Sequence, residues 1–162
     1  MANFSSTDTE STADREFVHS RLVEAPQDRV FRALSEPDQL ARWWGPQGFS
    51  STFQVFEFRP RGTWRFVMHG PDGTNYPNES VFREIVAPER VVLEHLSEDH
   101  HFFMTITLTA QGDRTLVGWR QVFDTAEHRE RIAKFVLEAN EQNLDRLIIA
   151  LATSSQAKVK ES

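Results

Sequence analysis

The chain has 162 residues, and its 24 acidic residues outnumber its 18 Lys and Arg residues, giving a formal charge of −6. This length suits one domain with its own core, and the excess of acids argues against nucleic acid as a partner. The absence of cysteine excludes disulfides, thiolate metal sites and cysteine nucleophiles, and is compatible with a reducing compartment.

The two ends of the chain differ in composition from its middle. Residues 1–15 are rich in Ser and Thr without apolar periodicity, and residues 153–162 are similar, so we expect flexible tails around a single domain spanning 16–152. The sequence has neither a basic and apolar leader nor a run of about 18 apolar residues. We therefore expect a cytoplasmic protein that does not insert into membranes.

The domain is predicted to begin with a β-strand followed by two short helices. A β-rich run starts at Glu16 and ends before Pro26. Each helix is opened by a proline, whose missing N–H is harmless in a first turn, and each has one apolar face. These sets are Pro26 with Val30, Phe31 and Leu34, and Pro37 with Leu40, Trp43 and Trp44. Gly45 and Pro46 end the second helix.

Six strands are predicted after the helices, because short alternating apolar segments recur between turn residues. They are residues 51–59, 63–69, 75–86, 90–96, 101–110 and 114–123. The clearest is 101–110, where Phe102, Met104, Ile106 and Leu108 alternate with threonines. Short connections join antiparallel neighbours, so we expect a meander.

A long helix is predicted from Ala126 to Ala152, with Asp124 or Thr125 as its cap. Its apolar stripe comprises Ile132, Phe135, Val136, Ala139, Leu144, Leu147, Ile148 and Leu151. We therefore predict an α+β fold: a curved antiparallel sheet of about seven strands, two short helices after the first strand, and one long C-terminal helix across the concave face. Such a pair of layers leaves a hollow between them.

Several segments, in this order, resemble the helix-grip family of START-like, or SRPBCC, domains. The nearest subgroup is similar to the C-terminal domain of the activator of heat-shock protein 90 ATPase. The matching segments are residues 25–34, 37–46, 58–73, 86–92, 122–131 and 143–147. The chain departs from the subgroup at Arg61-Gly62, where a Gly-Gly pair is usual, and at Glu57, where Asp is usual.

The resemblance implies a deep cavity that binds a small apolar ligand in many relatives, with cyclase or dehydratase chemistry in a few. The residues predicted to form the ligand site are large apolar side chains and one amide: Trp43, Trp44, Trp64, Phe66, Met68, Phe102, Met104, Trp119, Phe123, Phe135 and Asn143. The alternative is that the aromatic residues fill a solid core. Asn140 and Asn143 adjoin the apolar stripe of the long helix, and either can hydrogen-bond a ligand or a protein group.

Other chemistry has weaker support in the sequence. His95, Glu98, Asp99, His100 and His101 are metal-competent, but their spacing matches no established site, so we expect no metal. Motifs for nucleotides, phosphate loops and hydrolase triads are missing, so we expect no cofactor. Five residues are candidates for acid–base chemistry, although their strand phase favours the solvated face: His69, Glu79, Arg83, Arg120 and Gln121.

Three functions follow from these observations. The leading hypothesis is a non-enzymatic protein that binds a small hydrophobic molecule in an internal cavity. The second is an enzyme of cyclase or dehydratase type acting in the same cavity. The third is a protein-interaction module, a homodimer or a chaperone accessory, that uses exposed apolar surface near Trp43 to Phe49.

Overall fold

The computed structural model describes residues 11–161, and the order of its elements matches the predicted order. The elements are η1 (Ala13–Arg15), β1 (Glu16–Val23), α2 (Gln27–Ser35), α3 (Pro37–Trp43), β2 (Ser50–Phe56), β3 (Thr63–His69), β4 (Asn75–Val86), β5 (Arg90–His95), β6 (Phe102–Gln111), β7 (Arg114–Phe123) and α4 (Ala126–Glu161). Both predicted prolines lie at helix starts: Pro26 is the N-cap of α2, and Pro37 opens α3.

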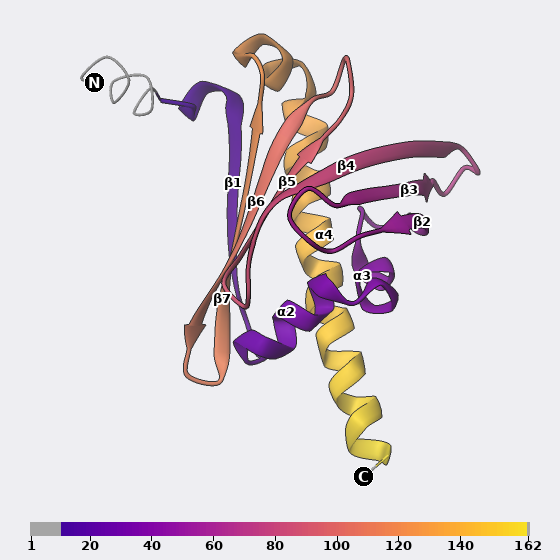
Figure 1. Cartoon of the computed structure of the whole chain (residues 1–162), viewed down its shortest axis with the longest axis vertical. Helices are drawn as coiled ribbons and strands as arrows, with labels where there is room; N and C mark the ends of the chain where they lie inside the picture. Colours follow the sequence, from indigo (N-terminus) through magenta and orange to yellow (C-terminus); the bar gives the residue numbers. More distant parts are fainter. Residues whose placement is uncertain (1–10, 162) are drawn as a thin grey trace.

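The strands form one seven-stranded sheet in the order β1-β7-β6-β5-β4-β3-β2. Strands β2 to β7 are the predicted antiparallel meander, and β1 closes the series by pairing with β7. Figure 1 shows α4 crossing one face of the twisted sheet, with α2 and α3 beside its central part. The predicted α+β helix-grip architecture is therefore confirmed.

Helix α4 is longer than predicted. Thr125 caps it, because the Thr125 hydroxyl accepts a hydrogen bond from the backbone N–H of His128 at 3.1 Å. The helix passes the predicted end at Ala152 and continues to Glu161. At the other end of the domain, Arg15 of η1 donates a hydrogen bond to the Phe123 carbonyl at 2.7 Å. The predicted flexibility of 1–10 concerns residues outside the described part of the chain.

The turn at Arg61-Gly62 explains how the chain tolerates its departure from Gly-Gly. Arg61 adopts φ = 69°, a conformation that favours glycine, and its N–H donates to the Phe82 carbonyl at 2.7 Å. Gly62 cannot be replaced in the same way, since a Cβ there would lie 2.0 Å from the Glu57 carbonyl oxygen. Glycine is therefore required at position 62, because another backbone segment lies too close for a Cβ, and it is not required at position 61.

Candidate functional site

All four tryptophans form one connected cluster where α3, α4 and the sheet meet. The Trp44 ring lies 5.6 Å from Trp43, 5.0 Å from Trp64 and 5.5 Å from Trp119, measured between centroids. The indole N–H of Trp43 donates to the Ala33 carbonyl at 3.0 Å. The cluster fills the space between the layers at this end of the sheet, because each ring packs against at least one other.

The segment after α3 is tied to α4 by two side chains. Asn143 donates from Nδ2 to the Trp43 carbonyl at 2.7 Å and accepts from the Gly45 N–H at 3.2 Å. Arg146 donates to the carbonyl oxygens of Arg42, Trp44, Gly45 and Pro46. Burial lowers the pKa of Arg146, which nevertheless stays charged. These two residues, the α4 clamp, fix Trp44 in place.

Six of the residues predicted to bind ligand contribute to packing and do not line the pocket described below. Four are buried in the main core: Trp43, Trp64, Met104 and Trp119. Phe123 packs edge-on against Phe17, with ring centroids 5.8 Å apart, in a second cluster. Asn143 has both amide ends engaged by the backbone of the Trp43–Gly45 segment. These six residues pack behind the side chains that line the pocket.

A pocket of about 160 Å³ lies beyond Trp44, between the sheet and the first half of α4. Its apolar lining is Trp44, Phe66, Met68, Leu93, Phe102, Phe135, Val136 and Ala139. Its polar lining is Asn78, Ser80, His95, His100, Gln121 and Asn140. This pocket thus brings together the other five residues predicted to bind ligand: Trp44, Phe66, Met68, Phe102 and Phe135. Phe135 is 67% exposed, which places it at the rim.

Strand register places the polar floor of the pocket. Ser80 of β4 is the direct cross-strand neighbour of His95 of β5, and His95 is the neighbour of Phe102 of β6. The His95 and Phe102 rings stack, with centroids 4.7 Å apart and an interplanar angle of 16°. His95 and Ser80 are 8% and 2% exposed. An uncharged polar pair is therefore held between aromatic walls.

Burial lowers the pKa of His95 to about 4, with further lowering from nearby His100 and His101, so the ring is neutral near pH 7. His100 also has a lowered pKa, caused first by burial and then by His128. Arg131 has only donors, so His128 Nδ1 must accept from it at 3.0 Å. His128 Nε2 then donates to His100 Nδ1, with 3.1 Å between the two nitrogens.

The amide part of the polar lining is satisfied within the protein. Asn140 donates from Nδ2 to Gln121 Oε1 at 3.1 Å, and the same nitrogen lies 3.4 Å from His19 Nε2. His19 Nδ1 in turn contacts Glu141 Oε2 at 2.5 Å. This chain of contacts joins β1, β7 and α4 at the edge of the pocket, so Asn140 has a partner even without a ligand.

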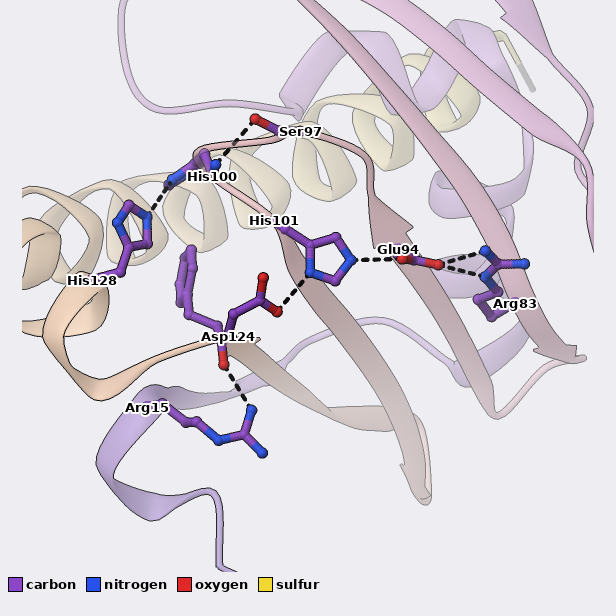
Figure 2. A network of polar contacts seen from close by, with 9 residues as sticks. Arg15, Arg83, Glu94, Ser97, His100, His101, Asp124 and His128 are labelled. Atoms are coloured by element: carbon purple, nitrogen blue, oxygen red, sulfur yellow. Dashed lines mark hydrogen bonds and ion pairs between the residues drawn. The ribbon is translucent and has the colours of Figure 1, made fainter.

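A charged network lies outside the pocket. His101 contacts Asp124 through Nδ1 at 2.8 Å and Glu94 through Nε2 at 2.6 Å, so both ring nitrogens donate and the ring is cationic. The hydrogen bond to Glu94 is the main cause of the raised pKa of His101, and that from His101 is the main cause of the lowered pKa of Glu94. Figure 2 shows His101 between the carboxylates, and His100 facing His128 instead.

Of the candidate acid–base residues, Gln121 alone lines the pocket. His69 bonds Thr52 and Asn75, while Glu79, Arg83 and Arg120 form ion pairs at the surface. Within residues 11–161, no group of three or more His, Asp or Glu side chains is placed to hold a metal ion.

Larger hollows are found on the surface. One of about 300 Å³ lies beside Arg42, Arg146 and Ile149, and one of about 380 Å³ lies between Asp38 and Phe53. Ile149 is 62% exposed, so the first is a solvated groove on α4. Neither hollow lies between the sheet and the helix.

Sequence reasoning missed His95 and Ser80 as pocket residues, although the sequence carried the signal. His95 is in phase with Val91 and Leu93 on β5, and Ser80 is in phase with Phe82 on β4. A polar residue on the apolar phase of a strand points into the core or into a cavity.

Residues 24–152 match the family described as "Activator of Hsp90 ATPase homolog 1-like protein". The chain belongs to this family. Several solved structures share its arrangement of elements. A protein from Nitrosomonas europaea superposes with a TM-score of 0.81 at 21% identity, covering 90% of this chain and 99% of that one. A protein from Arthrobacter aurescens gives a TM-score of 0.81 at 24% identity, covering 89% and 90% of the two chains.

A third structure, the AHSA1 protein from Silicibacter pomeroyi, gives a TM-score of 0.69 at 19% identity, covering 86% of this chain and 99% of that one. At these identities the likeness shows the fold. No curated protein matches the chain. Among the described helices of this family member, none combines the length and apolar character needed to span a membrane.

Replacing Asn143 by Ala tests the α4 clamp. The change leaves the Trp43 carbonyl and the Gly45 N–H buried without partners, so we expect a loss of about 3 kcal/mol in unfolding free energy. Lys134→Ala, at an exposed position on the same helix, is the control and should change stability by less than about 0.5 kcal/mol. Urea unfolding measures both. Equal stability of the two variants would show that the clamp does not hold the segment.

Replacing His95 by Phe tests the burial of its neutral ring. The folded pKa of about 4 lies below the ordinary 6.5, so the unfolded chain takes the proton first, and wild-type stability falls as pH drops from 6.5 towards 4. A phenylalanine side chain at this position cannot titrate. The variant should therefore gain about 2 kcal/mol relative to wild type between pH 7 and pH 5 in urea unfolding. A difference in stability between the variant and wild type that stays the same from pH 7 to pH 5 would contradict the assignment.

Proposed function

We propose that this chain binds a small, largely apolar molecule in the pocket between the sheet and α4. The observation that carries the proposal is the lining itself. Eight apolar side chains and six polar ones surround about 160 Å³, and no Asp, Glu, Lys or Arg is among them. An apolar cavity with a few convergent polar groups is the usual form of a small-molecule site. A cavity of roughly 150 Å³ holds one benzene ring in another protein, so the expected ligand is small.

Binding is favoured over catalysis by the character of the ionisable groups. His95 and His100 line the pocket, which gives the cyclase or dehydratase alternative its only titratable groups there. However, the pKa of His95 is about 4, and a general base works best when its pKa lies near the working pH. His100 has a lowered pKa and is already bonded to His128. Neither residue is poised to move a proton at neutral pH.

The interaction hypothesis, which used an exposed apolar surface near Trp43 to Phe49, receives no support from the two tryptophans of that segment. Trp43 and Trp44 are 0% and 9% exposed, so they form core and offer no apolar patch to a partner. The Hsp90 link in the family description therefore has no support from these residues.

A pocket-filling variant tests the proposed function. Ala139 lines the pocket, so Ala139→Phe should occupy its volume and weaken binding of toluene at least about tenfold. Leu137→Phe adds a ring to an exposed position on the same helix and should leave binding unchanged. Titrations followed by tryptophan fluorescence, with Trp44 at the wall as reporter, measure both.

Native mass spectrometry of protein purified from cells adds a second measurement, since a copurified small molecule should be present in wild type and reduced in Ala139→Phe. Wild-type protein that shows no saturable toluene binding, or an Ala139→Phe variant that binds as well as wild type, would contradict the proposal.

A further inference from the structure

The pocket lining contains two largely buried polar side chains that have no side-chain hydrogen-bond partner in the described part of the protein. No side-chain hydrogen bond among the described residues involves His95 or Ser80, whereas their neighbours His100 and Asn140 are both engaged. His95 and Ser80 are more than nine-tenths buried, and both line the pocket. Neither residue has a polar atom that is both fully buried and unpaired, so these atoms are reached from the pocket that the two residues line. A molecule in the pocket is therefore their available hydrogen-bond partner.

The chemistry of the pair restricts that partner. A neutral imidazole offers one donor and one acceptor, and a serine hydroxyl also donates and accepts. Ser80 and His95 are cross-strand neighbours, so their polar atoms can converge on one group. A hydroxyl group can donate to one of them and accept from the other. A carbonyl oxygen can only accept, so it would give no proton to the acceptor atoms of His95 and Ser80.

The walls restrict the rest of the ligand. Phe102 stacks on His95, and Trp44 and Phe66 line the same pocket, so a flat ring finds aromatic faces to contact. A volume of about 160 Å³ suits one ring. A carboxylate or ammonium group would lose its water without gaining a countercharge, because no lining residue among those described carries a carboxylate, ammonium or guanidinium group.

We propose that the ligand is an uncharged, single-ring aromatic molecule whose hydroxyl group is bound by His95 and Ser80. This inference rests on the proposed function and deepens it, because it names the chemical class that the pocket selects. The neutrality of the His95 ring near pH 7 keeps its acceptor nitrogen available to the hydroxyl proton.

The test compares phenol, toluene and benzoate as probes, with dissociation constants measured by NMR titration. Phenol and toluene have similar shapes, and only phenol carries the hydroxyl. We expect wild type to bind phenol roughly tenfold or more tighter than toluene, as two hydrogen bonds to buried groups imply. Benzoate should bind weakest. The imidazole ¹⁵N signals of His95 should shift with phenol and much less with toluene.

Two variants make the test specific. Ser80→Ala should remove most of the preference for phenol, measured as the ratio of the toluene and phenol dissociation constants of the same variant, and His95→Phe should do the same. Ser20→Ala is the matched control, because Ser20 is exposed on β1 and away from the pocket. It should keep the full preference.

The outcomes separate this inference from the proposed function. Saturable binding of toluene with no preference for phenol would overturn the hydroxyl assignment and leave the proposed function standing. Benzoate as the tightest probe would overturn the requirement for an uncharged ligand. Failure of both neutral probes to bind wild type would contradict both proposals together.

Discussion

The contact on which the rest of the structure depends is the packing of Trp44 between α3, α4 and the sheet. Its ring touches those of Trp43, Trp64 and Trp119. The clamp residue Arg146 bonds the Trp44 carbonyl, and Asn143 bonds the backbone on either side of Trp44. Two layers that twist differently cannot fit together along their whole length. Here they meet at the tryptophans, and the remaining space, the pocket, lies on the other side of Trp44.

The chemistry of that space follows from strand register. Strand pairing brings Ser80, His95 and Phe102 side by side. His101, just before β6, instead contacts Glu94, whose side chain lies on the opposite face of β5 from His95. Three histidines close in sequence thus have three different environments: His95 buried and neutral, His100 bonded to His128, and His101 cationic between two carboxylates. A pocket with neutral polar groups and no fixed charge suits an uncharged ligand.

The sequence predicted the fold more closely than the site, for a physical reason. Alternation along β6 and the stripe on α4 report which face of each element is buried, and burial is what fixes the layers. Alternation cannot distinguish a core residue from a pocket residue on that face. Trp64 and Phe66 share one strand face and both belong to the main core, yet Phe66 also lines the pocket and Trp64 does not. The position of Trp44, which separates the two environments, is set by tertiary contacts of α4 with the Trp43–Gly45 backbone.

The presence of an open pocket between the sheet and α4 is tested most directly by soaking bromobenzene into a crystal of the wild-type protein. The anomalous scattering of bromine then locates the bound molecule. The account predicts one strong bromine site between β5, β6 and the first half of α4, in contact with His95 and Phe102. A crystal in which this space is closed by side chains, with bromine only in the surface grooves, would contradict it.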